Sequence, residues 1–404
     1  MEKLIYLTIF LLPTYLLRFS VGKIPTNLFE ILVVIILVSY LWNFKKYIPV
    51  KNFTGYKKYS WPVFLILAGL FISTFWNCYF SNVLTAVSTS VSTPAYTCST
   101  GLGILKGWFL VPLVFVFLVR RIVPREKIKN IFRAYYLSAL GVAIISLFFL
   151  LSEHLTFDGR LEGIFNSPNY LAMYLAPAVI MFFFKTLETK NRALNTISVV
   201  SLLIVLSALY KTYSYASWTA TLISILIVSL INYKISFKKI VLSLAIFFLL
   251  LFSQIHDKKL NTFFDSRSSS ASRIMIWNSS KKILKDNFLF GIGPENFQNK
   301  YLAYQKYFPP YLEWAVPHPH NVFLAFWLSG GILSLAGFVW IIALFSKNIF
   351  SRLKHRKTLA QKYLLNAAYV SLGIIFYILL HGLVDTTIFK NDLAVVFWLC
   401  LLAI

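Results

Sequence analysis

Two histidines and a carboxylate stand at points of the chain where proton chemistry is possible. His320 follows His318 in the stretch PHPHNVF and opens a long apolar run, and Asp385 follows His381 in the stretch HGLVD. An imidazole titrates near neutral pH, so His320 has the range to take a proton from a hydroxyl or to donate a hydrogen bond to a phosphate oxygen. Asp385 is expected either to orient His320 or an arginine, or to cap the turn before Thr386.

The two histidines also have the His-x-His spacing of metal ligands. However, no cysteine and no third histidine lies nearby in the sequence, and the chain contains no Asp-x-Asp pair of the kind that holds a diphosphate through a divalent ion. We therefore expect a metal-independent site without a cofactor, in which His318 is an ordinary loop residue.

Basic side chains are the candidates for binding phosphate groups. A guanidinium donates two parallel hydrogen bonds to phosphate oxygens and keeps its charge, so arginine suits this task best. Arg273, four residues before Trp277, is the first candidate. Arg160 and Lys211 are the next candidates, and Arg267 is the last one. Contact with lipid headgroups is the competing interpretation for each.

These residues belong to a chain with the composition of a membrane protein. Of its 404 residues, 58% are hydrophobic and only 13% are charged, where an ordinary soluble domain is roughly 25% charged. The mean hydropathy is +0.71. This composition excludes a soluble globular enzyme. The net charge of +25 does not indicate nucleic-acid binding, because the Lys and Arg residues fall in short clusters between apolar runs.

Dividing the chain at those clusters predicts an all-α integral membrane protein with about twelve transmembrane helices, since a helix of about 20 residues crosses the bilayer. Helices 1 to 9 are expected within residues 1–254, and helices 10 to 12 within residues 320–404. The expected spans are 4–20, 24–43, 61–77, 101–119, 131–152, 168–184, 194–211, 213–231, 239–254, 320–346, 361–381 and 388–404.

The distribution of positive charge sets the orientation of these helices. With the N-terminus inside, 24 of the 39 Lys and Arg residues fall in the inner loops, as the positive-inside rule requires. Both termini are therefore predicted to be cytoplasmic and residues 255–319 to form one long extracytoplasmic loop. Within this loop, residues 266–285 predict an amphipathic helix on the membrane surface, with Ile274, Trp277 and Ile283 on its apolar face.

Two further features follow that helix in the loop. The stretch GIGPENF at 291–297 is typical of a turn. An aromatic run from Tyr301 to Trp314 is either an interfacial belt or a platform for sugar rings.

The order of these motifs resembles the O-antigen ligase and O-antigen polymerase superfamily of polytopic glycosyltransferases, which use lipid-linked glycans on the outer face. The resemblance rests on Arg273 with Trp277, on GIGPENF, on the His-Asn pair at the start of a helix, on GIFNSPNYLA at 163–172 and on HGLVD at 381–385. It covers roughly residues 160–404.

The chain departs from the family pattern at two places. Where the family commonly carries the arginine of Ser-Arg-Gly-x-Trp, this chain has Tyr215, which leaves Lys211 as the nearest cation. Nine residues after His320, the family usually has a glutamate before a Gly-rich turn, and this chain has Ser329 followed by two glycines. The first change affects which cation binds the diphosphate, and the second is interpreted as a packing change.

The resemblance implies an O-antigen ligase-like enzyme that transfers a glycan from a polyprenyl diphosphate donor to a glycolipid, lipid or protein acceptor. It implies work on the extracytoplasmic face of the cytoplasmic (inner) membrane, among membrane lipids and without nucleic acid. The implied catalytic residues are His320, Arg273 and Asp385. The residues expected to bind diphosphate or glycan are Arg160, Lys211, Asn169, Tyr215, Arg267 and Asn321.

Two alternative functions compete with the ligase. A polymerase that joins lipid-linked repeat units shares the outer loop and its histidine, and the His-Asn junction with the downstream aspartate favours the ligase. A lipid or glycolipid transporter also fits twelve spans. The sequence, however, lacks corresponding halves, and it has few ionisable residues in mid-span.

Three cysteines are too few for a disulfide framework. Cys78 and Cys98 bracket an uncharged, Ser/Thr-rich outer loop, where a disulfide and two free thiols are both compatible with the sequence. Cys400 lies in the last expected span and should be reduced.

Overall fold

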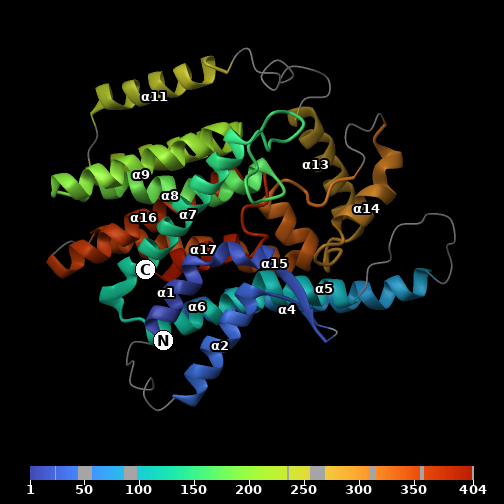
Figure 1. The fold of residues 1–404 in the computed structure, drawn as a ribbon. Helices are drawn as coiled ribbons and strands as arrows, with labels where there is room; N and C mark the ends of the chain where they lie inside the picture. Colours follow the sequence, from blue (N-terminus) through green and yellow to red (C-terminus); the bar gives the residue numbers. More distant parts are fainter. Residues whose placement is uncertain are drawn as a thin grey trace.

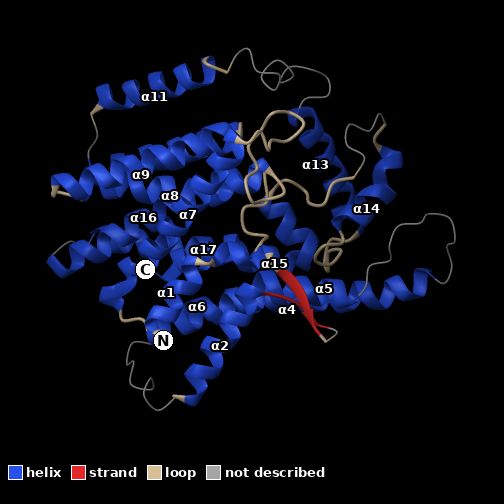
Figure 2. Cartoon of the chain, viewed as in Figure 1, coloured by secondary structure: helices blue, strands red, loops and turns tan. Residues whose placement is uncertain are grey.

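The computed structural model describes residues 1–22, 24–43, 57–85, 98–233, 236–254, 269–309, 315–354 and 359–402, which are mostly helical (Figure 1). Figure 2 shows one small pair of strands beside the helices. The helices are α1 (Glu2–Phe10), α2 (Leu28–Trp42), α4 (Lys57–Thr85), α5 (Cys98–Ile104), α6 (Val111–Ile122), α7 (Ile128–Leu151), α8 (Pro168–Glu188), α9 (Arg192–Lys211), α10 (Tyr215–Tyr233), α11 (Phe237–Phe252), α13 (Ser269–Asp286), α14 (Phe297–Tyr304), α15 (Val322–Lys354), α16 (Leu359–Gly382) and α17 (Asn391–Leu402). Short 3-10 or π turns are η1 (Leu12–Leu16), η2 (Leu105–Leu110), η3 (Arg125–Lys127) and η5 (Gln305–Tyr307), and the strands are β1 (Arg18–Val21) and β2 (Ile24–Asn27).

Among the described residues, seven helical segments are long and apolar enough to cross a membrane. They are Lys58–Tyr79, Cys98–Ile122, Ile128–Leu151, Pro168–Leu187, Arg192–Lys211, Tyr215–Asn232 and Val322–Ser351. Shorter apolar helices cover Leu28–Trp42, Ile240–Phe252, Ala367–Gly382 and Asn391–Leu401. Each of these segments coincides with an expected span, so the helical, multi-span character of the chain is confirmed. The count of twelve stays a prediction.

The first expected span differs from the prediction. Helix α1 ends at Phe10, and Pro13 lies in the short turn η1, where its missing N–H and fixed φ do not favour a continuing helix. Strand β1 then pairs antiparallel with β2, Arg18 opposite Asn27. The prediction of one helix over 4–20 is therefore wrong, and the all-α prediction misses this hairpin.

Helix α15 is broken at Gly330 and Gly331, and the turn that precedes α14 fills the break. Gly331 has φ 66°, and a Cβ there would lie 2.0 Å from the Leu289 carbonyl oxygen, so only glycine fits. Across the break, Ile292 N donates to Leu328 O at 2.7 Å and Ile332 N donates to Leu289 O at 3.2 Å. These bonds replace hydrogen bonds that the broken helix loses. They hold the GIGPENF turn against α15.

Helix α13 agrees with the helix expected over 266–285, but its buried face is different. Ile276 and Ile283 are buried with Ser280, whereas Ile274 is 56% exposed. Ile274 therefore lies outside the face that packs against the protein. The buried face packs against α14 and α15, as the cluster with Phe297, Tyr301 and Leu328 shows. How α13 lies relative to a membrane stays a prediction, and Trp314 of the aromatic run lies outside the described residues.

Cys78 and Cys98 form a disulfide. It decides between the two alternatives left open by the sequence, and it fastens the start of α5 to α4. Cys400 is free and buried in α17. Asn77, next to Cys78, donates to the Gly291 carbonyl oxygen at 3.3 Å, so this part of α4 also contacts the GIGPENF turn.

Candidate active site

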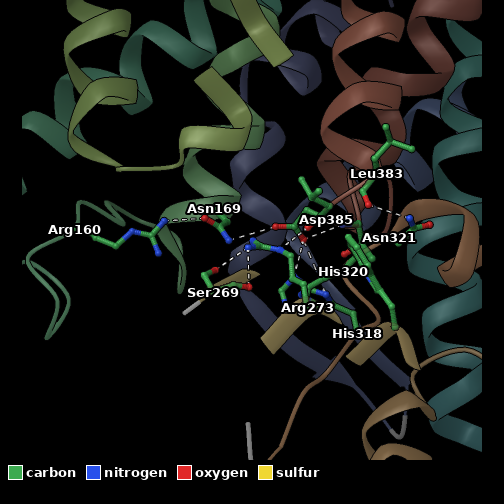
Figure 3. Close-up of polar contacts among 12 residues, drawn as sticks. Arg160, Asn169, Ser269, Arg273, His318, His320, Asn321, Leu383 and Asp385 are labelled. Carbon is green, nitrogen blue, oxygen red and sulfur yellow. Dashed lines mark hydrogen bonds and ion pairs between the residues drawn. The ribbon is translucent and has the colours of Figure 1, made fainter. Parts of the chain in front are cut away.

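Three titratable side chains meet between the start of α15 and the turn after α16 (Figure 3). Asp385 is buried, and its Oδ1 lies 3.5 Å from His320 Nδ1 and 4.0 Å from His318 Nδ1. The two imidazole rings are 4.2 Å apart between centroids. The structure thus brings together His320 and Asp385, which the sequence predicts to be site residues.

The expectation that His318 is an ordinary loop residue is wrong. His318 precedes Pro319, and a proline favours extended backbone at the residue before it. Side chains two residues apart on an extended chain share one side, so both imidazoles face the same carboxylate. His320 itself has φ 46°, a left-handed conformation that is uncommon for a residue with a side chain.

The electrostatics of the three groups are unequal. Burial by itself raises the pKa of Asp385, but the close His320 ring, followed by His318 and His381, outweighs burial and holds this pKa well below its ordinary value. For His318, burial lowers the pKa to about 3, and the neighbouring His320 lowers it further. At neutral pH, an ionised Asp385 therefore lies beside a neutral His318.

Asn169 connects Asp385 to a partly buried arginine. Its Nδ2 donates to Asp385 Oδ2 at 3.3 Å, and its Oδ1 accepts from Arg160 Nη2 at 2.8 Å. Arg160 Nε donates to the Thr212 carbonyl oxygen at 2.8 Å. Burial lowers the pKa of Arg160, and the nearby Asp158 opposes this effect, so the guanidinium remains charged. Figure 3 shows the row from Arg160 through Asn169 to Asp385.

Two side chains of α13 hold the backbone on both sides of the histidine–aspartate contact. Arg273 Nε donates to the Val384 carbonyl oxygen at 2.9 Å, and its Nη1 donates to Ser269 Oγ at 2.7 Å. Trp277, one turn later, donates from Nε1 to the His320 carbonyl oxygen at 3.2 Å. Residues four apart share a helix face, which explains the R-x-x-x-W spacing. Within the described part of the chain, Arg273 Nη2 has no hydrogen-bond partner.

Asn321 fastens α15 to the same turn. Its Oδ1 accepts from Phe323 N at 2.9 Å and from Leu324 N at 3.0 Å, which is the pattern of a helix N-cap. Its Nδ2 donates to the Leu383 carbonyl oxygen at 2.9 Å. The structure thus gives Asn321 a positioning role, and its binding of substrate stays a prediction.

The remaining predicted residues lie beside this assembly or outside the described residues. Lys211 O accepts from Leu161 N at 2.9 Å, so the end of α9 helps to hold the loop of Arg160. No hydrogen bond or ion pair among the described residues joins the Lys211 ammonium to Asp385. Tyr215 packs edge-on against Trp218, with ring centroids 5.4 Å apart. Arg267 lies outside the described residues. We refer to His318, His320, Asp385, Asn169, Arg160 and Arg273 as the Asp385 cluster.

A cavity of about 650 Å³ adjoins the Asp385 cluster at His318. The charged residues that line it are not predicted as site residues. They are Arg18, Glu30, Lys106, Glu295 and Lys390. The sequence carries one signal for it, because Glu30 and Lys106 are opposite charges at the ends of two apolar spans. The structure pairs them, with Lys106 Nζ 2.8 Å from Glu30 Oε2. We refer to this volume as the Lys390 cavity.

Comparison with known proteins agrees with the motifs. A family model described as O-antigen ligase matches residues 199–339, a range that contains Arg273, Trp277, His318 and His320. The match supports the resemblance to the O-antigen ligase superfamily over these residues. A search of curated proteins finds no match.

Proposed function

We propose that this protein is an O-antigen ligase-like glycosyltransferase that transfers a glycan from a polyprenyl diphosphate to a glycolipid, lipid or protein acceptor. The observation that supports it most is the Asp385 cluster. There, a histidine–carboxylate pair lies beside two arginines within the fold of a chain whose residues 199–339 match an O-antigen ligase.

The transfer exchanges one bond for another. An acceptor hydroxyl oxygen forms a bond to the anomeric carbon of the donor sugar, the bond from that carbon to the diphosphate oxygen breaks, and the hydroxyl proton leaves. Polyprenyl diphosphate is the second product. The protein must therefore accept one proton and stabilise negative charge on the leaving diphosphate.

His320 is the group that we assign to the proton. If its Nδ1–H faces Asp385, its Nε2 has the free lone pair that takes a hydroxyl proton, and the ionised carboxylate stabilises the resulting imidazolium. Asn169 holds the other oxygen of Asp385 and so fixes the direction of the carboxylate.

Arg273 and Arg160 are the groups that we assign to the diphosphate. Arg273 uses Nε and Nη1 to bind the protein, so its Nη2 is the donor that remains for a phosphate oxygen. Because these guanidiniums already supply positive charge, we propose that the reaction needs no metal ion. His318, His320 and Asp385 do have ligand atoms within 4.8 Å of one another, so this claim requires its own test.

The orientation in the membrane follows the charge distribution. We propose that the active site faces the extracytoplasmic side of the cytoplasmic membrane, with both termini cytoplasmic and residues 255–319 as the outer loop. The disulfide between Cys78 and Cys98 supports this side, because disulfides persist in oxidising compartments.

The test uses the purified full chain in detergent with a polyprenyl diphosphate-linked glycan and candidate acceptors, and it measures release of polyprenyl diphosphate. His320→Ala and Arg273→Lys should each slow release by about 10²-fold or more. His154→Ala, at an exposed outer-loop histidine, is the matched control and should leave the rate unchanged.

Four outcomes would contradict parts of the proposal. Unchanged release in His320→Ala and Arg273→Lys would exclude the assigned site. Loss of release with EDTA, restored by a divalent ion, would exclude the metal-free mechanism. Release only when a second lipid-linked glycan is the acceptor would favour the polymerase, and lipid translocation in vesicles without release would favour a transporter.

A further inference from the structure

The Lys390 cavity is a second compartment beside the Asp385 cluster, and the two meet at His318. The cavity lies between the β1–β2 hairpin, α5 with η2, the GIGPENF turn and the segment before α17. Its lining includes His318 and Thr386, but Arg160, Arg273 and Asn169 are not among the described residues that line it. The guanidiniums assigned to the diphosphate therefore face a different space. A volume of about 650 Å³ lies within the range of sites that enclose a ligand of several rings.

The cavity lining has one positive charge in excess, because it holds Arg18, Lys106 and Lys390 against Glu30 and Glu295. Lys390 is one of these cations. Its Nζ lies 4.3 Å from the centroid of the Tyr170 ring and 6.0 Å from that of Trp108. Within the described part of the chain, this ammonium has no ion pair and no hydrogen bond. A half-buried ammonium that is held only by aromatic faces is suited to an anionic partner from outside the chain.

One part of the cavity wall is polar, and its polar groups are already paired. Lys106 pairs with Glu30 and also donates to the Pro25 carbonyl oxygen, while Thr26 Oγ1 donates to Glu30 Oε2 at 3.0 Å. Asn391 Nδ2 donates to the Gly107 carbonyl oxygen at 3.0 Å. Such a wall presents fixed dipoles to a ligand and does not demand a second charge from it. It fits a ligand with many hydroxyl groups.

Aromatic side chains complete the lining. Trp108, Tyr170 and Phe297 all border the cavity, and Trp108 packs edge-on against Phe389 with ring centroids 6.1 Å apart. Aromatic faces offer apolar area to the C–H faces of sugar rings, and the polar wall takes their hydroxyls. The combination of aromatic faces, paired polar groups and an excess positive charge suits sugar rings that carry an acid group.

We propose that the Lys390 cavity binds the acceptor, as a saccharide whose carboxylate or phosphate pairs with Lys390 and whose reacting hydroxyl reaches the Asp385 cluster past His318. This inference rests on the proposed glycosyltransferase function. It adds the chemical class of the acceptor and separates the binding site of the acceptor from that of the diphosphate.

A binding measurement with the full chain in detergent tests the charge preference. The probes are a linear tri-uronate saccharide and its carboxyl-reduced, neutral counterpart, and calorimetry gives their Kd values. The acidic probe should bind at least about tenfold more tightly. Lys390→Met should remove that preference and Lys390→Arg should keep it.

Lys306→Met is the matched control for the lysine. The Lys306 ammonium also lies over an aromatic ring, at 5.2 Å from the Tyr307 centroid, but it does not line the cavity. This variant should bind both probes as the unaltered chain does. Equal Kd values for the two probes, or an equal loss in Lys306→Met and Lys390→Met, would overturn the proposal. Retention of the preference by Lys390→Arg shows that the fold tolerates a substitution at position 390.

A competition experiment separates this inference from the function on which it rests. Saturating polyprenyl diphosphate without a glycan should leave the Kd of the tri-uronate within about twofold, because the diphosphate is assigned to the arginines. Displacement of the tri-uronate would overturn the separate acceptor site. His320→Ala should lose transfer and keep the tri-uronate preference. Transfer that persists without any preference for the acidic probe contradicts only the cavity, and a preference without transfer contradicts only the proposed function.

Discussion

The Asp385 cluster and the Lys390 cavity lie side by side, but they use their polar groups differently. In the cluster, the Asp385 carboxylate accepts hydrogen bonds from Asn169 and from the Thr386 amide. Arg273 and Trp277 donate hydrogen bonds to the neighbouring backbone carbonyls. In the cavity, the Lys390 ammonium has aromatic neighbours and no hydrogen bond from the described residues. The cluster is thus fixed before any ligand arrives, as catalysis requires. The cavity has charge left to recognise a ligand.

The two regions also differ in origin along the chain. The cluster is built from short motifs in the second half of the chain and from the loop before α8 with the first turn of that helix. Much of the cavity lining comes from the N-terminal hairpin and from α5, which lie far from those motifs in the sequence. Changes at the N-terminal half should therefore affect acceptor binding, and changes at the motifs should affect transfer.

The largest expected effect is that of Asp385→Asn. The amide keeps the shape of the side chain but loses the charge that orients His320 and stabilises its protonated form, so release of polyprenyl diphosphate should fall about 10²- to 10³-fold. The Kd of the tri-uronate should change by less than about twofold. Asp286→Asn, at an exposed carboxylate that accepts from Tyr304, is the control. Equal losses of transfer and of probe binding would erase the distinction between the two regions.

The next effect is that of breaking the disulfide. Closing a loop of 20 residues stabilises the fold by about 3 kcal/mol, so Cys78→Ser should lower the thermal midpoint of unfolding clearly. Ser99 and Thr100, just after Cys98, line the cavity, so binding of the tri-uronate should weaken while release from the donor continues. Cys98→Ser and the double variant should match Cys78→Ser. A double variant that is much less stable than either single one would show that the two thiols act separately.

A smaller effect is expected from acid, through His318 at the boundary of the two regions. Its pKa is about 3 in the fold and near 6.5 in an unfolded chain. Below pH 6.5 the unfolded chain therefore binds a proton that the folded chain does not, and stability falls as the pH falls. Between pH 7 and pH 5 the loss should be about 2 kcal/mol. The pKa of Asp385 is lowered in the fold, so the stability that this carboxylate contributes is lost only when the pH falls below its unfolded-state pKa near 4. Asp385 therefore does not contribute to the loss between pH 7 and pH 5.

Thermal unfolding in detergent at pH 7 and pH 5 measures this effect. His318→Asn carries no titrating ring and should lose less stability on acidification than the unaltered chain. His320, Arg273 and Lys390 remain around position 318 in both proteins, so the difference isolates the ring. His154→Asn is the exposed control and should leave the acid loss unchanged. An acid loss that is the same in His318→Asn would exclude His318 as its source.

The smallest effect is expected at Asn321. Asn321→Ala removes the cap of α15 and its bond to Leu383, which should cost about 1 kcal/mol of stability. The Kd values for donor and tri-uronate should remain unchanged, which the same calorimetry measures. A clear rise in either Kd would restore the prediction that Asn321 contacts substrate.

Sequence reasoning succeeds where the signal is local. The helix over 266–285 and the R-x-x-x-W pair follow from short stretches, whereas the approach of Asp385 to His320 is one of the alternatives that the sequence leaves open. It does not identify the packed face of α13, because that face is set by contacts with α14 and α15, which composition does not reveal. It undervalues His318 because the third ligand-like group, Asp385, lies far away in the sequence.

The N-terminal hairpin and the Lys390 cavity show the other limit. Pro13 interrupts the first apolar run, but hydropathy averages over it and predicts one span. The Glu30–Lys106 pair joins two spans that lie far apart in the sequence. Such long-range pairs depend on how helices pack, and a single sequence carries only the hint that two charges stand in apolar surroundings.

The left-handed backbone of His320 has an evolutionary consequence. A residue with a side chain costs about 1 kcal/mol or more in this conformation, whereas glycine adopts it freely. His320→Gly should therefore unfold at a higher temperature than His320→Ala, although both lose the ring. Relatives that have given up transfer would gain stability by drifting to glycine here. A histidine that persists at this position thus marks a protein still under selection for its chemistry.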